Sequence, residues 1–147
     1  MKIYILSVII LLLSVQSSNA QNHETIIGKW QSVHGTGQIQ IIKRGDQYFG
    51  KLVYLSEPND NTGKPKVDSK NPDEKFQHRA LLGIEMLKDF KLKDSNTFIG
   101  GKIYDPKSGN TYNGQMNLID HDKLNIRAFF GISILGKTET WTRVKNP

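Results

Sequence analysis

The side chains best suited to chemistry lie in the polar segment "DSKNPDEKFQHR", residues 68–79. Asp73, Glu74 and His78 are close in sequence, and a histidine beside an acid can transfer protons. Arg79 could hold an anion, because a guanidinium pairs well with planar anionic groups. One hypothesis is therefore a small hydrolase or isomerase that uses Asp73, His78 and Arg79.

The same segment also has a structural interpretation. Asn71-Pro72-Asp73 favours a turn that starts a short helix, with Asn71 or Asp73 as its N-cap and Pro72 near its first position. Arg79 would then pair with Asp73 or Glu74 and hold the segment at the rim of the fold. Residue spacing cannot show that the acid and the histidine meet. We therefore favour recognition or scaffolding and predict no catalytic residue.

Other reactive groups are poorly supported. The chain has no cysteine, which excludes thiol chemistry and cysteine-based metal sites. Neither a Gly-x-Ser-x-Gly elbow nor a Ser-x-x-Lys motif is present. No metal-ligand spacing connects the histidines, which are His23, His34, His78 and His121. No metal and no cofactor are predicted.

The N-terminus predicts a secretory signal peptide, residues 1–20. A charged start leads into an apolar run over residues 3–15, and small residues follow at Ser18 and Ala20. The run is shorter than the roughly 20 residues that span a bilayer, and no cysteine follows it for a lipid anchor. We expect cleavage after Ala20 and an exported protein, periplasmic or secreted. Residues 21–147 fit a single domain.

The charge balance does not indicate a nucleic-acid partner. The formal net charge is +6, but the lysines are scattered singly along the chain without a basic block. An exported chain without a DNA- or RNA-binding motif is a poor candidate for nucleic-acid binding. No transmembrane segment is predicted after the signal peptide, and the sequence does not indicate an oligomeric state.

Most of the chain alternates apolar and polar residues at period two, with Gly- and Asn-rich turns between the alternating runs. We expect eight strands, at residues 26–33, 38–42, 48–55, 80–90, 97–104, 111–118, 124–130 and 137–144. The paired glycines Gly100 and Gly101 predict a bulge or bend. Asp105 begins a strong turn, "DPKSGN", in which Pro106 fixes φ and Gly109 permits a positive φ.

Two of these strands carry an ambiguity. Residues 80–90 contain good helix formers, but alternation and Gly83 favour a strand. In the last strand, one face holds Trp141 with charged neighbours and the other holds threonines. The sequence leaves open which of these faces points inward.

Strands joined mostly by short hairpins predict closure, because closure removes exposed edges. The predicted fold is all-β: an eight-stranded antiparallel up-and-down barrel with one long loop or short helix between strands three and four. Eight strands enclose either a filled core or one small ligand. A β-sandwich is the alternative.

Gly28-Lys29-Trp30 in the first strand and Arg143 in the last resemble the calycin pattern of lipocalins and their relatives. The resemblance implies that the tryptophan closes the barrel floor and that the arginine packs across it. An arginine on a tryptophan face adds cation–π attraction, which makes the arrangement physically reasonable.

Three further runs resemble an uncharacterised exported bacterial family, domain of unknown function 2147. They are "NPD…R…LLGIEML" (71–87), "GGKIYDPKSGNTY" (100–112) and "GKTETWTR" (136–143). The resemblance implies a calycin-like barrel and a periplasmic or secreted location, and it implies no activity. One departure is Ala80, where members often carry proline.

Aromatic residues suggest what such a barrel would bind. An inward-facing lining of tyrosines suits a small amphipathic or aromatic ligand. The residues expected to face inward are Tyr48, Tyr54, Tyr104, Tyr112 and Phe130. The predicted ligand-binding residues are Tyr54, Arg79, Tyr104, Tyr112, Arg127 and Trp141. The predicted structural residues are Gly28, Trp30, Asn71, Pro72, Asp73, Asp105 and Arg143.

The leading functional hypothesis is a non-enzymatic barrel that binds a small lipid-like or aromatic molecule, with the connection at residues 56–80 as rim or lid. The first alternative is an envelope module with a filled barrel that contacts a protein or glycan. The second is the hydrolase or isomerase described above. A cavity would favour the first hypothesis, and a packed interior with an exposed apolar patch would favour the first alternative.

Overall fold

The computed structural model describes residues 26–145, so the predicted signal peptide lies outside the described residues. The strands are β1 (Gly28–Gln31), β2 (Gly37–Arg44), β3 (Gln47–Leu55), β4 (Glu85–Leu92), β5 (Thr97–Asp105), β6 (Asn110–Asp120), β7 (Lys123–Phe129) and β8 (Gly136–Arg143). Two short 3₁₀ helices interrupt the connections, η2 (Glu74–Phe76) and η3 (Ser133–Leu135).

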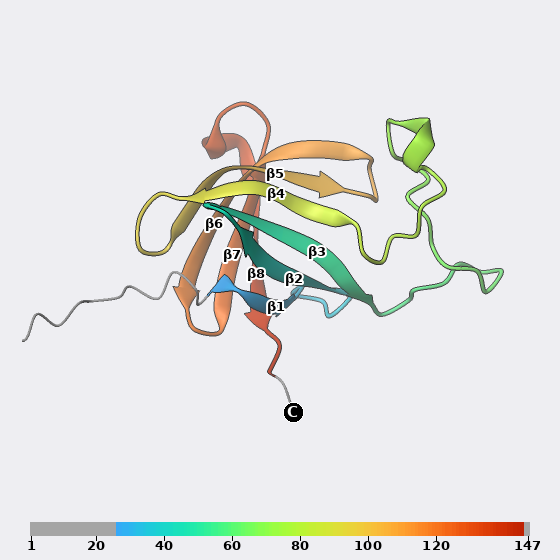
Figure 1. Cartoon of the computed structure of the whole chain (residues 1–147), viewed down its shortest axis with the longest axis horizontal. Helices are drawn as coiled ribbons and strands as arrows, with labels where there is room; N and C mark the ends of the chain where they lie inside the picture. The colour runs from blue at the N-terminus through green and yellow to red at the C-terminus, as the bar shows by residue number, and fades with distance from the viewer. Residues whose placement is uncertain (1–25, 146–147) are drawn as a thin grey trace, which may run out of the picture.

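The strands form one closed barrel in which each pairs with its neighbours in sequence order (Figure 1). Every pairing is antiparallel, and β1 meets β8 through Trp30 opposite Arg143. Closure leaves no free sheet edge. The predicted eight-stranded up-and-down barrel is confirmed, including the long connection between β3 and β4 with its single 3₁₀ turn. No helix within residues 26–145 has the length and hydropathy needed to cross a bilayer.

The alternation in the sequence accounts for the inward faces of most strands. In β2, Ile39 and Ile41 are buried on the same face, as predicted. In β6, Met116 and Leu118 are buried, and Asn117 between them is only partly buried. A half-buried strand needs this period of two, because successive side chains point to opposite faces.

The predicted strand at residues 80–90 has the right type but begins too early. β4 starts at Glu85, because Gly83 adopts a φ of +94° and redirects the chain just before it. Leu82, which falls inside the predicted strand, precedes β4 and is 45% exposed. The helix-forming residues do not decide the structure here, since pairing with β3 and β5 overrides local propensity.

The bend predicted at the paired glycines is present. Gly100 has a φ of +74°, and the register of β5 against β6 shifts between Phe98 and Gly101. A Cβ at Gly101 would overlap the ring of Phe90. The bare glycine backbone therefore lets this aromatic ring pack directly against the sheet.

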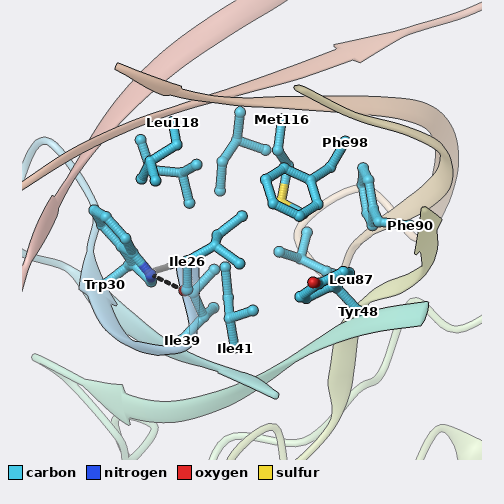
Figure 2. Packing of buried hydrophobic residues seen from close by; sticks show 12 residues of the cluster. Ile26, Trp30, Ile39, Ile41, Tyr48, Leu87, Phe90, Phe98, Met116 and Leu118 are labelled. Carbon is cyan, nitrogen blue, oxygen red and sulfur yellow. Dashed lines mark hydrogen bonds between the residues drawn. The ribbon is translucent and has the colours of Figure 1, made fainter. Parts of the chain in front are cut away.

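Side chains fill one half of the barrel. Figure 2 shows Trp30, Tyr48, Phe90 and Phe98 converging with aliphatic side chains from several strands. Tyr48 and Phe98 meet edge to face, with ring centroids 4.8 Å apart. A smaller group of Leu52, Ile84 and Tyr104 forms a second buried cluster.

Candidate functional site

One end of the barrel is hollow. The connections β1–β2, β3–β4, β5–β6 and β7–β8 meet at this end, and between them lies a cavity of about 1330 Å³. We call this the open end. The opposite end, where β1 begins and β8 finishes, is the closed end.

The cavity changes in character from floor to rim. Its apolar lining includes Ile39, Leu52, Leu87, Ile103, Ile126 and Trp141. Its charged lining comprises Glu57, Asp60, Lys66, Lys70, Asp105, Lys107, Lys137 and Glu139. Apart from Lys137 and Glu139, these charges belong to the connections or to the last residue of a strand. An apolar interior with a charged entrance suits an amphipathic molecule.

Half of the predicted ligand-binding residues line this cavity: Tyr104, Tyr112 and Trp141. Tyr112 stacks against Phe130 at the rim, with ring centroids 4.5 Å apart. The other half do not line it: Tyr54, Arg79 and Arg127.

The expected inward position of Tyr54 is wrong. The register of β2 against β3 shifts from Gln38 opposite Tyr54 to Ile39 opposite Leu52, so one extra residue of β3 bulges between them. The bulge reverses the alternation, and Tyr54 is 44% exposed.

Arg127 also lies away from the cavity. It alternates with the inward residues Leu124 and Ile126, and its Nη1 donates to the Thr138 hydroxyl at 2.9 Å. Arg127 therefore lies on the outer face of the barrel, beside the threonines of β8. The inward face of β8 is the Trp141 face, which settles the ambiguity in that strand: Lys137, Glu139 and Trp141 line the cavity, and Lys137 and Glu139 form an ion pair of 3.0 Å.

Arg79 holds the long connection together. We call residues 56–84, between β3 and β4, the cap. Within it, Arg79 donates to Oδ2 of Asp68 through Nε at 3.1 Å and Nη2 at 2.8 Å. The predicted partners, Asp73 and Glu74, are not the ones it uses. Asp73 instead caps η2 and accepts from the backbone N–H of Lys75.

Asp68 is fully buried, and three side chains surround its carboxylate and donate four hydrogen bonds to it. Besides the two Arg79 bonds, Asn71 Nδ2 donates to Oδ2 at 2.8 Å and the Tyr104 hydroxyl donates to Oδ1 at 2.6 Å. Tyr104 belongs to β5 and lies 36 residues away in sequence. A buried charge needs such partners, so we call these four residues the carboxylate cluster, and it fastens the cap to the barrel wall.

The cluster shifts two pKa values in opposite directions. Burial of the Asp68 carboxylate disfavours its charge, but hydrogen bonds from Tyr104, Asn71 and Arg79 outweigh burial and hold its pKa below the usual value. Burial, followed by the bond to Asp68 and its negative charge, raises the pKa of Tyr104 to about 12. Both groups therefore keep the protonation states that their hydrogen bond requires over a wide pH range.

A second contact seats the cap on the β5–β6 turn. Gly109 has a φ of +76° and lies directly under the carbonyl oxygen of Lys70, which a Cβ would overlap. Asp105 shapes the same turn by accepting from the backbone N–H of Lys107 at 3.0 Å and from the Ser108 hydroxyl at 2.7 Å. Gly109, which was predicted for its turn geometry, therefore also provides the contact surface on which Lys70 of the cap packs.

The proposed catalytic residues do not converge. Across residues 26–145, no hydrogen bond or ion pair links His78 to Asp73 or Arg79. His78 is exposed, and none of the three lines the cavity. No group of three acids or histidines placed to hold a metal occurs in the same part of the chain.

Trp30 and Arg143 define the closed end. The guanidinium carbon of Arg143 lies 4.2 Å from the centroid of the Trp30 ring, while its Nε and Nη1 donate to the carbonyls of His121 and Ile27. Trp30 is fully buried and donates to the Ile26 carbonyl at 2.8 Å (Figure 2). Gly28 has a φ of +136°, and a Cβ there would lie 2.9 Å from Arg143 Nη1. The arginine can cover the tryptophan because Gly28 leaves it room.

Sequence reasoning missed Asp68, although it is the first residue of the polar segment that was singled out. An aspartate eleven residues before the arginine gives no local signal, because the chain must turn back before the two meet. Asn71, directly before Pro72, indicates only a turn.

Comparisons with known proteins agree with this geometry. Residues 28–143 match the model of a family described as "Uncharacterized protein conserved in bacteria (DUF2147)". Among solved structures, the chain is similar to one described as "Protein HP1028 from the human pathogen Helicobacter pylori belongs to the lipocalin family", with a TM-score of 0.72 and 21% identity. That match covers 82% of this chain and 83% of the other. No curated protein matches the chain.

Proposed function

The chain belongs to the DUF2147 family of bacterial proteins, and we propose that it is a binding protein that holds a small amphipathic molecule, lipid-like or aromatic, in its open-end cavity. The observation that carries the proposal is the one-sided filling of the barrel. Side chains pack the closed end, while the open end keeps a cavity of about 1330 Å³ with an apolar floor. Small-molecule sites are typically concave and mostly apolar, with a few polar groups.

The lining gives the ligand an orientation. Its apolar part would lie against Trp141, Ile126 and Leu87, and its polar end would reach the charged rim. Of the rim lysines, Lys66 pairs with Glu57 at 3.4 Å and Lys137 with Glu139. A polar head group at the rim keeps its hydration, so only the apolar part needs to leave water.

The proposed location is outside the cytoplasm. The N-terminal sequence supports it, because a charged start, an apolar run and Ser18-x-Ala20 are the parts of a secretory signal. The mass of the protein purified from its producing cell should correspond to a chain that starts at Gln21. The same native mass measurement should reveal a co-purifying small molecule.

Two tyrosines offer a matched test of the binding site. Tyr112 lines the cavity, whereas Tyr54 lies on the outer surface at 44% exposure. An amphipathic naphthalene sulfonate dye should bind the wild-type protein, and Tyr112→Ala should weaken its affinity by roughly tenfold through lost contact area. Tyr54→Ala should leave the affinity unchanged.

Fluorescence locates the dye independently. Trp141 lines the cavity and Trp30 is buried at the closed end, so dye binding should quench Trp141 and spare Trp30. Trp141→Phe should therefore abolish most of the quenching. Equal effects of the two tyrosine substitutions, with quenching that survives Trp141→Phe, would contradict a site in the cavity.

A further inference from the structure

The β7–β8 connection carries the most exposed apolar side chains of the described chain. We call residues 130–135, "FGISIL", the apolar loop. Its exposed fractions are 60% for Phe130, 65% for Ile132, 77% for Ile134 and 75% for Leu135, the four highest of any large apolar residue between positions 26 and 145. Folded proteins seldom leave so many large apolar groups together in water unless the surface has a partner.

The loop projects from the barrel and is not pressed into it. Figure 1 shows it arching beyond the end of β7, with η3 directly before β8. Each of its four apolar side chains is at least 60% exposed, and Phe130 also contacts Tyr112 at the rim, with ring centroids 4.5 Å apart. A lipid interface can surround protruding side chains, whereas a protein partner would need a matching pocket for each.

The charge around the loop has the sign that an anionic lipid surface attracts. Arg127 and Lys137 flank the loop at the open end, residues 127–138 contain no aspartate or glutamate, and the first acid after the loop, Glu139, pairs with Lys137 at 3.0 Å. The Arg127 guanidinium lies close to the backbone of Gly136, at the base of the loop, and the Lys137 side chain is 82% exposed. Basic residues beside an apolar segment add electrostatic attraction to anionic head groups.

We propose that the apolar loop docks the open end of the barrel onto an anionic lipid bilayer, with its apolar side chains in the interface and Arg127 and Lys137 against the head groups. The loop is continuous with the cavity, because its first and last residues, Phe130 and Leu135, also line the cavity. Docking would therefore place the cavity mouth at the lipid surface. The docking surface itself does not require a ligand in the cavity.

The test is co-sedimentation of the mature chain with vesicles, using phosphatidylglycerol mixed with phosphatidylcholine and phosphatidylcholine alone. Ile132 and Ile134 are the residues to change, since both are exposed and neither lines the cavity. The double variant Ile132→Ser, Ile134→Ser should lose at least about tenfold in partitioning to the anionic vesicles. Removing phosphatidylglycerol or raising the salt should also weaken binding, because both reduce the electrostatic part.

Ile119→Ser is the matched control, because Ile119 is 54% exposed but lies beside the β6–β7 turn at the closed end. It should sediment like the wild type. The loop variant should keep the wild-type unfolding transition and dye affinity, so that a failure of docking and a failure of cavity binding are distinguishable.

Insertion can also be detected directly. A tryptophan at position 132, in Ile132→Trp, should be quenched by brominated lipid in the anionic vesicles, while the same tryptophan at Ile119 should not be. Sedimentation equal to wild type in the loop double variant, or no association of the wild type with anionic vesicles, would overturn the proposal. Loss of a protein partner by the loop variant, with vesicle binding unchanged, would assign the loop to a protein instead.

Discussion

The two ends of this barrel are built from different interactions. The closed end is filled by Trp30, Phe90 and their neighbours, so its stability comes from buried apolar area and tight packing. The open end keeps a cavity and relies on a few hydrogen bonds to one buried carboxylate, Asp68, to hold its cap. We therefore expect the closed end to unfold only as a unit, and the cap to open without unfolding of the sheet.

The largest effect should come from the closed end. Trp30→Ala removes the largest fully buried side chain and leaves Arg143 without its aromatic partner, so we expect the free energy of unfolding to fall by about 3–5 kcal/mol. Chemical denaturation monitored by circular dichroism would measure it. A loss below about 1 kcal/mol would mean that the closed end does not carry the stability of the barrel.

A substitution in the carboxylate cluster should reduce stability locally, in the cap. Asp68→Ala leaves the Tyr104 hydroxyl, the Asn71 amide and the Arg79 guanidinium without their acceptor, at a cost of about 2–4 kcal/mol. We expect this loss of stability to appear mainly as opening of the cap.

Hydrogen exchange would separate the two regions after Asp68→Ala. Amides in the cap should exchange faster, and those of β6 and β7 should stay protected. Asp73 is exposed, and Asp73→Ala removes only the side-chain hydrogen bond at the start of η2. This substitution should therefore disturb residues 56–84 far less. Uniform loss of protection across the barrel would show that the two ends are not energetically separate.

The smallest effect concerns alkaline pH. The folded-state pKa of Tyr104 is about 12, above its ordinary value near 10, so its contribution to stability is complete below pH 10 and is lost as the pH rises toward 12. Between pH 10 and 11 the wild type should lose about 1 kcal/mol relative to Tyr104→Phe. Tyr54→Phe, on the outer surface, is the control and should follow the wild type.

At acid pH the dependence is reversed, and stability should fall as the pH decreases. The pKa of Asp68 is lowered in the folded protein, so its stabilisation is present above its unfolded pKa near 4 and disappears as the pH falls through the folded value. The stability difference between wild type and Asp68→Ala should therefore narrow below about pH 4.

The sequence was informative where local pattern decides structure. Alternation in β2 and β6 predicted the inward faces, and the paired glycines predicted the bend of β5. The prediction that Tyr54 points inward failed because nothing at residues 52–54 marks the bulge that reverses the alternation there.

The candidate site was only partly predictable for a related reason. Tyr112 follows from strand parity, whereas parity left open whether Trp141 points inward. The Asp68–Tyr104 bond joins residues whose proximity depends on how the whole barrel closes. Arg79 was identified as an anchor, and its true partner was not, since local spacing favoured Asp73 and Glu74. Side-chain partners across a long connection are set by tertiary structure and not by separation along the chain.

The 36-residue separation between Asp68 and Tyr104 also dictates an order of assembly. The cap is synthesised before the strand that holds Tyr104 and before Gly109, on which Lys70 rests. It cannot be fastened until β5 and β6 have paired, so it should be the last part of the open end to settle and the first to loosen. The rate at which the proposed ligand enters and leaves the cavity would then depend on opening of the cap, independently of how tightly the lining holds the ligand.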